Sequence, residues 1–234
     1  MRISHKYKFV FLAYPRTGST TVRAILDDYS DIKSVHISQT TKEFPFYDHI
    51  LARELKPIFE KQGWDWFAYR RFCVVRNPYD RVVSLYHHYR RVNADKKKAR
   101  KSFYYFLKYT YFKLRPELTF SAYVMRFNRT RNLALPLREF ICDEDGEFLV
   151  DDVLPFEHLH TALPDYLRQM GILVNQDKIP ILNASANRQP YAHYYTDETR
   201  REVEMRYAYE IERFSYAFDE TVSDATVRTN SNAT

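Results

Sequence analysis

The sequence predicts an α/β fold in which helices flank a central parallel sheet. Two segments support this prediction, residues 7–29 and residues 71–89, because each runs from an apolar, strand-like stretch through a polar turn into a helical pattern. Strands that alternate with helices in this way favour a parallel sheet with helices on its faces. The 234 residues suffice for one domain with a sizeable core, and we expect that domain to span residues 1–218.

The individual elements follow from the spacing of apolar residues and from turn residues. Apolar runs bounded by turn signals predict strands at residues 7–14, 35–37 and 71–75. Helical periodicity predicts helices near residues 19–29, 49–62, 78–89, 103–113, 119–129, 163–170 and 197–214. The apolar runs 139–142 and 147–150, joined through Asp145-Gly146, predict a small hairpin. The C-terminal part is therefore expected to be helical, and residues 219–234 are expected to form a disordered tail.

The net charge of +6 is concentrated in one segment. Residues 90–101 hold seven Lys and Arg side chains and one Asp, so the rest of the chain is neutral overall. Such a block is typical of a solvated segment, and the alternative is a patch for an anionic acceptor or for peripheral contact with a membrane surface. It lacks the interleaved aromatic side chains on which bases stack, so we expect no nucleic-acid partner.

The turn after the first expected strand has the properties of a phosphate-binding site. Residues 15–21 open a helix, where unpaired backbone N–H groups and the helix dipole attract anions. The lone glycine of this turn allows the backbone to approach a ligand closely. A Walker loop is excluded because Gly-Lys-Ser/Thr is missing, and an ordinary Ser/Thr helix cap is the alternative. The candidate ligand-binding residues are Arg16, Thr17, Gly18, Ser19, Thr20 and Thr21.

A second strand-turn-helix segment offers a second phosphate site. Arg76 ends the strand at residues 71–75, and Ser84 follows about two turns into the next helix. The planar fork of an arginine and a serine hydroxyl suit a terminal phosphate monoester. A capped helix with surface salt bridges is the alternative, in which Arg81 pairs with a carboxylate.

Taken together, residues 15–20 and residues 76–84 resemble the two cofactor loops of sulfotransferases that use 3′-phosphoadenosine-5′-phosphosulfate (PAPS). The resemblance is to the family 2 carbohydrate sulfotransferases, which include heparan 2-O, chondroitin and HNK-1 enzymes and bacterial members. It implies a P-loop-like three-layer fold, and it implies that the first loop holds the 5′-phosphosulfate and the second loop the 3′-phosphate. The expected reaction is in-line transfer of the sulfuryl group to a hydroxyl of a carbohydrate or glycolipid acceptor, with 3′,5′-ADP as product and no metal.

The chain departs from the family pattern at two positions. Arg16 stands where the family usually has Lys, so we expect an electrostatic role at the departing phosphate rather than proton donation. Pro155 replaces the usual Arg before Phe156-Glu157, so this segment is expected to be structural. The resemblance also favours a nucleotide contact in the polar loop with Asn183, Ser185 and Arg188, for which an ordered turn is the alternative.

The acceptor hydroxyl needs a general base that is poised near neutral pH. His49 precedes a helix at the place where the family carries a catalytic histidine, so we expect it to be the base. His36 and Glu54 are the alternatives. The pairs His87-His88 and His158-x-His160 lack the further Cys or carboxylate ligands of a zinc site, and we expect no metal.

The composition bears on the cellular location and on disulfides, and two functions other than sulfuryl transfer stay open as alternatives. The chain has no hydrophobic signal segment and no apolar run of roughly 18 residues, so we expect no membrane span and a cytoplasmic location. A bacterial-type enzyme and a catalytic domain trimmed from a longer protein both fit. Two cysteines, Cys73 and Cys142, make no disulfide framework. The alternatives to a sulfotransferase are a P-loop-like nucleotide kinase and a non-enzymatic basic module that binds anions or nucleic acid.

Overall fold

The computed structural model describes residues 1–93, 107, 110, 119–127, 134–174 and 189–219. Contacts divide the chain into two compact units. The first, which we call the sheet unit, comprises Met1–Asn77 and Leu135–Ala186, and the second, the helical unit, comprises Pro78–Ala134 and Asn187–Thr234. The expectation of a single domain over residues 1–218 stays a prediction.

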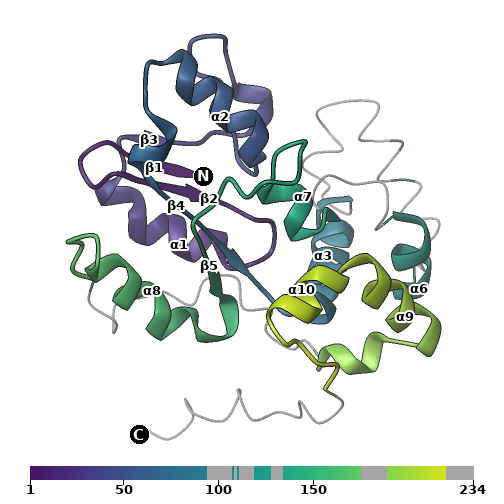
Figure 1. Cartoon of the computed structure of the whole chain (residues 1–234). Helices are drawn as coiled ribbons and strands as arrows, with labels where there is room; N and C mark the ends of the chain where they lie inside the picture. Colours follow the sequence, from purple (N-terminus) through teal and green to yellow (C-terminus); the bar gives the residue numbers. More distant parts are fainter. Residues whose placement is uncertain (94–106, 108–109, 111–118, 128–133, 175–188, 220–234) are drawn as a thin grey trace, which may run out of the picture. The chain divides into compact units, whose positions relative to one another are not determined.

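A five-stranded sheet forms the centre of the sheet unit, with the strand order β3-β1-β2-β4-β5 (Figure 1). The strands are β1 Arg2–Ser4, β2 Phe9–Leu12, β3 Ile32–Lys33, β4 Arg70–Val75 and β5 Asp152–Pro155. Strands β2, β4 and β5 run parallel, whereas β1 is antiparallel to both β2 and β3. The predicted α/β fold is therefore confirmed, with the correction that its sheet is mixed rather than wholly parallel.

The strand expected at residues 35–37 is misplaced in the sequence prediction. Strand β3 lies earlier, at Ile32–Lys33, and Val35 forms only an isolated bridge with Tyr47. Residues Ile37–Gln39 form a 3₁₀ turn that the His36 side chain caps by accepting a hydrogen bond from the backbone N–H of Ser38. Local capping thus ends the extended segment that the apolar alternation suggested.

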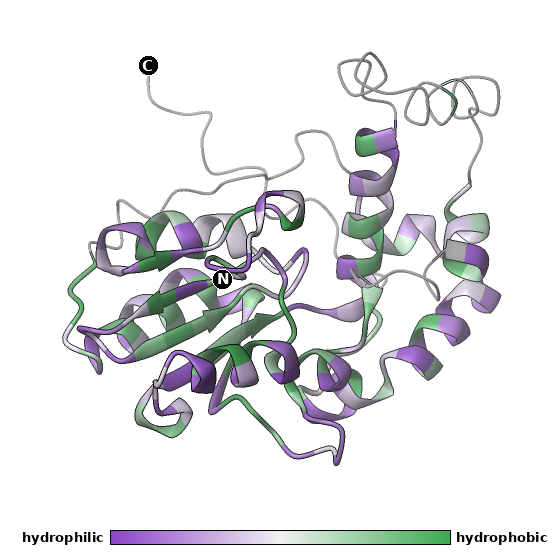
Figure 2. Ribbon diagram, turned by 90° about the horizontal axis from the view of Figure 1, so that it is seen from above, coloured by the Kyte–Doolittle hydropathy of each residue, from purple (hydrophilic) through white to green (hydrophobic). Residues whose placement is uncertain are grey.

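Helices α1 (Ser19–Leu26) and α8 (Leu159–Arg168) cover one face of the sheet. Their apolar side chains share one buried cluster with alternate residues of two parallel strands, Phe9 and Phe11 of β2 and Phe72 and Val74 of β4. The period of two along each strand places these residues on the same face. Figure 2 shows these central strands in the colours of hydrophobic residues, as expected for strands that are covered by helices.

Helix α2 (Ala52–Lys61) lies on the other side of the sheet from α1 (Figure 1). Its Phe59 is fully buried and makes edge contacts with Trp64, Trp66 and Tyr69, at ring-centroid distances of 5.1, 5.2 and 4.8 Å. The helix expected at residues 49–62 therefore begins three residues later, because Leu51 keeps an extended backbone and Glu54 accepts a hydrogen bond from its N–H.

The small hairpin expected at residues 139–150 is largely replaced by a helix. Leu137–Ile141 forms α7, whose Leu137, Phe140 and Ile141 are buried. The chain then reverses, and Cys142 and Phe148 form a single antiparallel bridge. Burial of three side chains at helical spacing decides against the first strand of the predicted hairpin.

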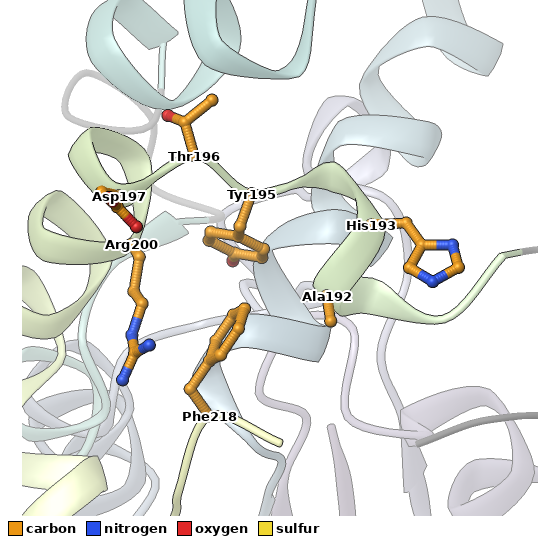
Figure 3. Close-up of a pocket in the computed structure, with 7 residues that line it drawn as sticks. All are labelled: Ala192, His193, Tyr195, Thr196, Asp197, Arg200 and Phe218. Atoms are coloured by element: carbon orange, nitrogen blue, oxygen red, sulfur yellow. The ribbon is translucent and has the colours of Figure 1, made fainter. Parts of the chain in front are cut away.

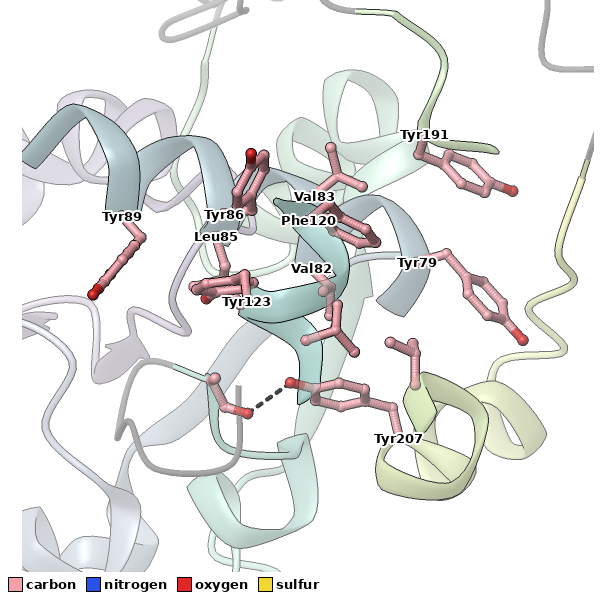
Figure 4. Packing of buried hydrophobic residues seen from close by; sticks show 13 residues of the cluster. Tyr79, Val82, Val83, Leu85, Tyr86, Tyr89, Phe120, Tyr123, Tyr191 and Tyr207 are labelled. Carbon is pink, nitrogen blue, oxygen red and sulfur yellow. Dashed lines mark hydrogen bonds between the residues drawn. The ribbon is translucent and has the colours of Figure 1, made fainter. Parts of the chain in front are cut away.

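The helical unit contains α3 (Pro78–Asn93), α6 (Phe120–Ala122) with a π-helical turn at Tyr123–Phe127, a 3₁₀ turn at Tyr191–Tyr194, α9 (Asp197–Arg206) and α10 (Ala208–Arg213). Its core is rich in tyrosine, as Figure 4 shows, and the Tyr207 hydroxyl donates to the Ala134 carbonyl at 2.7 Å. The single helix expected at residues 197–214 is divided at Tyr207, whose backbone leaves the helical region.

Two expectations about helices and tails fall largely outside the described residues. Of the helix expected at 103–113, only residues 107 and 110 are described, and of the tail 219–234 only residue 219. Among the described helices, none combines the length and the apolar character that a bilayer crossing needs.

Candidate functional site

Three parallel strands end side by side in the sheet unit. Leu12 of β2 is paired with Cys73 of β4, and Val75 of β4 is paired with Pro155 of β5. The segments that follow these strands contain Arg16, Arg76 and Phe156, respectively. Open α/β sheets bind ligands outside the carboxyl ends of their parallel strands, so this edge is the place where a site is expected.

The first of these segments is a tight turn with two left-handed residues. Arg16 has φ 66° and Gly18 has φ 77°. The Thr17 hydroxyl is buried and donates to the Tyr14 carbonyl at 2.8 Å, which closes the turn. The Thr17 side chain therefore holds the loop together, and its backbone N–H is the group that remains suited to a ligand.

Helix α1 begins directly after this turn. Gly18 occupies the N-cap position, and no side chain makes the capping hydrogen bond that an N-terminal Ser, Thr or Asp usually provides. The sequence alternative of an ordinary Ser/Thr cap is therefore wrong. Ser19 and Thr21 are buried, whereas Thr20 is exposed. A helix end of this kind attracts anions through its N–H groups and its dipole.

Gly18 is required for a steric reason as well as for its backbone conformation. A Cβ atom at this position would lie 2.8 Å from the Phe156 ring and 3.1 Å from Leu159. The aromatic ring therefore packs directly on the glycine of the first loop. Any larger residue would have to displace the ring or the loop.

Arg76 connects the second loop to the first. Its guanidinium donates to the Arg16 carbonyl at 3.2 Å and lies 4.4 Å from the centroid of the Phe156 ring. The left-handed backbone of Arg16 thus places a carbonyl where Arg76 can reach it. Stacking and hydrogen bonding together fix the plane of the guanidinium.

Phe156 and Glu157 contact both loops, although the sequence reasoning assigned them no site role. Phe156 lies against Gly18 and Arg76, as described above, and the Glu157 carboxylate accepts a hydrogen bond from the Asn77 N–H at 2.7 Å. The signal that could have found them was the Phe-Glu pair itself. The sequence predicts no binding role for this pair, because Pro155 stands where the family usually has an arginine.

His49 is hydrogen-bonded to the backbone directly after β2, the strand that also leads into the first loop. Its Nδ1 lies 2.6 Å from the carbonyl oxygen of Ala13, the residue that follows β2. Because a carbonyl only accepts hydrogen bonds, Nδ1 carries the proton and Nε2 of the neutral ring has the free lone pair. Burial lowers the pKa of His49 from 6.5 to about 4, although the bond to Ala13 opposes this shift. The ring is therefore neutral at pH 7, and its pKa lies below the near-neutral value expected for the general base.

The two alternative bases are engaged in local structure. His36 is exposed, and its Nδ1 accepts from the Ser38 N–H, so it serves as a helix cap. The Glu54 carboxylate accepts from the Tyr47 hydroxyl and from the Leu51 N–H at the start of α2. His49, by contrast, is bonded to Ala13, two residues before the turn at residues 15–21.

The remaining predicted residues belong to other parts of the chain. Ser84 lies on α3 of the helical unit, so its pairing with Arg76 stays a prediction. Asn183, Ser185 and Arg188 lie outside the described residues. Arg81 is fully buried, with its guanidinium 5.6 Å from the centroid of the Tyr207 ring, so the alternative of a surface salt bridge is wrong for this residue.

The described residues contain no group of three or more His, Cys, Asp or Glu side chains placed to hold a metal ion. Of the histidines considered for zinc, His87 bonds through Nε2 to the Tyr194 hydroxyl at 3.0 Å. The cysteines are free thiols, and both are buried. The expectation of no metal stays a prediction.

Each of the two units contains a cavity. One, of about 250 Å³ in the helical unit, is shown in Figure 3, where the rings of Tyr195 and Phe218 lie close together and Arg200 lies beside Phe218. The other, of about 490 Å³ in the sheet unit, lies between basic residues of α2 and the acidic segment 143–145. Among the site candidates that the structure describes, Glu54 alone lines one of these cavities.

A turn that opens helix α1, an arginine after the neighbouring strand and a buried histidine thus lie at the sheet edge where open α/β sheets bind ligands. The model of the sulfotransferase family matches residues 1–217, and the chain belongs to this family. No curated protein and no solved structure matches the chain. The family match extends through both compact units.

Proposed function

We propose that the chain transfers the sulfuryl group of PAPS to a hydroxyl of a carbohydrate or glycolipid acceptor. The observation that carries this proposal is the direct link between the two loops, in which Arg76 donates to the Arg16 carbonyl and stacks on Phe156. Two cationic side chains that follow neighbouring strands suit a ligand with two separate phosphate groups. PAPS is such a ligand, and its use is general in the family to which the chain belongs.

Arg16 and the start of α1 bind the 5′-phosphosulfate in this proposal. The backbone N–H groups of residues 17–21 lie at the N-terminus of α1, which is the positive end of its dipole, and Gly18 lets them approach the phosphate. Ser19, Thr20 and Thr21 add hydroxyl groups. Arg16 stabilises the negative charge that develops on the departing phosphate oxygen, an electrostatic role that a permanently charged guanidinium can fill.

Arg76 binds the 3′-phosphate, with Ser84 as a second donor. The Phe156 stack leaves the guanidinium less rotational freedom, so less entropy is lost when it binds an anion. Asn183, Ser185 and Arg188 are proposed to contact the nucleotide from the later polar loop, on the evidence of the family resemblance alone. Phe156 and Glu157 join this set as residues that hold the two loops together.

His49 is the proposed general base. Its Nε2 accepts the proton of the acceptor hydroxyl while the acceptor oxygen forms a bond to sulfur and the bond from sulfur to the 5′-phosphate oxygen breaks. The electron pair of the broken bond leaves with 3′,5′-ADP. The Ala13 carbonyl, which accepts from Nδ1–H, stabilises the imidazolium that forms.

Binding of 3′,5′-ADP tests the proposal before any acceptor is known. We expect calorimetric titration to show one site per chain, and we expect Arg76→Ala to weaken binding at least tenfold because a phosphate loses its cationic partner. Arg70→Ala is the matched control, since Arg70 lies at the opposite end of β4 and pairs with Asp152. Absence of 3′,5′-ADP binding by the unaltered protein would reject the proposal.

Transfer itself requires an acceptor screen. Incubation with PAPS labelled in its sulfate and a panel of glycans and glycolipids is expected to give a labelled saccharide. Transfer only to phenols or amines would keep the sulfotransferase assignment and contradict the acceptor class. Labelled inorganic sulfate in the absence of any acceptor would indicate hydrolysis instead.

A further inference from the structure

We propose that Asp48 is a positioning residue that fixes the orientation of His49 through an ion pair with Arg23 of α1 and a hydrogen bond with Ser34. The inference rests on the proposed function, because it concerns the base of that reaction. It goes beyond that function by naming two residues, Asp48 and Arg23, that no motif of the chain indicates.

His49 sits in a backbone conformation that needs external support. Its φ is 62°, in the left-handed region that residues other than glycine rarely adopt. Such a conformation is strained and persists only where the surroundings hold it. The conformation brings Nδ1 to the Ala13 carbonyl, so the turn that contains His49 determines where its ring points.

The residue before His49 is held from several sides. The Asp48 N–H donates to the Val35 carbonyl at 2.9 Å, next to the bridge between Val35 and Tyr47. The Asp48 Oδ1 accepts hydrogen bonds from the Ser34 hydroxyl at 2.5 Å and from the Arg23 guanidinium. Backbone and side chain of Asp48 are therefore both fixed immediately before the left-handed residue.

Arg23 joins this turn to the helix that begins at the phosphate loop. It lies one turn into α1, and its Nε donates to the Ser19 carbonyl at 3.3 Å while Nη1 donates to Asp48. The side chains of Arg23 and Asp48 are only 19% and 29% exposed, so water screens their pairing less than at a surface. Helix α1, which is proposed to bind the 5′-phosphosulfate of PAPS, and the turn that contains His49 are therefore connected by the ion pair between Arg23 and Asp48.

The amino group of Met1 is a further charged group near Asp48. The amino group of Met1 lies 3.9 Å from Asp48 and donates to the Ser34 hydroxyl at 2.8 Å. Arg2 pairs with Asp27 at 2.5 Å, beyond the end of α1, and it also donates to the Ser34 hydroxyl at 3.4 Å. Asp27→Asn leaves Ser34, Asp48 and His49 themselves unaltered, so it is a control for the loss of one ion pair at the end of α1.

The first test reads the tautomer of His49 and needs no activity. In ¹⁵N-histidine-labelled full-length protein at neutral pH, two-bond ¹H–¹⁵N correlation spectra identify which ring nitrogen is protonated, and His49→Gln assigns the signal. We expect the Nδ1–H tautomer in the unaltered protein and in Asp27→Asn. In Asp48→Asn and Arg23→Gln we expect a mixture of both tautomers, because the ring no longer stays on the Ala13 carbonyl.

The second test measures transfer. We expect Asp48→Asn and Arg23→Gln each to lower kcat by up to about 10²-fold, the effect of a misplaced catalytic group, with KM for the donor nearly unchanged. Arg23→Lys keeps the charge and is expected to restore much of kcat. The double variant should be little worse than either single variant, since both break the same link.

The two tests separate the possible failures. If Asp48→Asn keeps the Nδ1–H tautomer and the kcat of the unaltered protein, the positioning role is overturned. If all variants lose folding to the same extent as Asp27→Asn in thermal melts and keep the tautomer, the ion pair serves stability alone and the proposal is again overturned. If the unaltered protein transfers no sulfate, the tautomer measurement still decides whether Asp48 orients His49.

Discussion

His49 combines a fixed tautomer, a buried ring and a hydrogen bond to Ala13, two residues before the turn at residues 15–21. The bond from Nδ1 to the Ala13 carbonyl leaves Nε2 as the acceptor of a proton. We expect His49→Ala to lower kcat by roughly 10² or more, as for a lost general base, with little change in 3′,5′-ADP binding. His36→Ala is the control, because His36 caps an exposed turn. Steady-state transfer assays check this, and a kcat that falls only in His36→Ala would move the role to that residue.

The same histidine links folding stability to pH. Its pKa is about 4 in the folded chain against 6.5 for an exposed histidine. Between these values the unfolded chain binds a proton that the folded chain does not, so the free energy of unfolding decreases as the pH falls from about 6.5 to about 4. We expect His49→Gln to flatten this part of the profile. Urea unfolding at several pH values provides the measurement, and equal slopes for the unaltered protein and His49→Gln would contradict the prediction.

Gly18 and Gly63 form a natural pair of test positions. Both have positive φ, 77° and 76°, but a Cβ at Gly18 would collide with Phe156, whereas nothing lies within 4 Å of one at Gly63. We expect Gly18→Ala to destabilise the protein by about 1–3 kcal/mol more than Gly63→Ala, since overpacking adds to backbone strain. Chemical denaturation measures this difference. Similar losses of unfolding free energy in the two variants would contradict the prediction, because they would mean that the Phe156 ring moves aside at little cost.

At the residue scale, the sequence singles out the turn at residues 15–21, Arg76 and His49, whose roles in binding and catalysis stay predictions. It did not reveal that the Thr17 hydroxyl closes the turn, or that His36 caps a helix, because hydrogen bonds between neighbouring backbone and side-chain groups leave no distinctive pattern. It also assigns Phe156 no site role, because Pro155 replaces the arginine that usually precedes this Phe-Glu pair in the family. Only the approach of β5 to β4 brings that ring onto Arg76.

At the scale of elements, strand β5 places Phe156 in contact with residues of both loops. Phe156 follows β5, and its ring supports both Gly18 and Arg76. We expect Phe156→Leu to weaken 3′,5′-ADP binding by roughly fivefold, because the stacking that orients Arg76 is worth about 1 kcal/mol. Tyr166→Leu removes a comparable stack from Arg70, 4.5 Å from that ring, and should leave binding unchanged. Calorimetry distinguishes the two, and equal effects would indicate a general loss of packing.

The elements that sequence predicted best are those with a strong apolar period or a clear turn. Strands β2 and β4 and helices α1 and α3 lie where the pattern predicted them. The three-residue strand β1 was missed because its pairing with β2 and β3 is non-local. The sequence predicts a strand where α7 forms. Five residues are too few for the spacing of apolar residues to distinguish a buried helix from a buried strand.

At the scale of the whole molecule, the net positive charge comes from residues 90–101, of which residues 94–101 lie outside the described part of the chain. Replacing Lys96, Lys97, Lys98 and Lys101 by Gln is expected to weaken binding to a polyanion column, so that elution occurs at lower salt. The affinity for 3′,5′-ADP should remain the same, because that ligand is assigned to the sheet edge. A parallel loss of nucleotide affinity would place the basic segment in the cofactor site.

Both tryptophans, Trp64 and Trp66, belong to the sheet unit, whereas the core of the helical unit is built largely from tyrosines. Tryptophan emission therefore reports on one half of the molecule, and the tyrosine bands of near-ultraviolet circular dichroism are weighted toward the other. Overlaid melting curves from these two optical signals would reveal whether the halves lose their structure in one cooperative step or in succession.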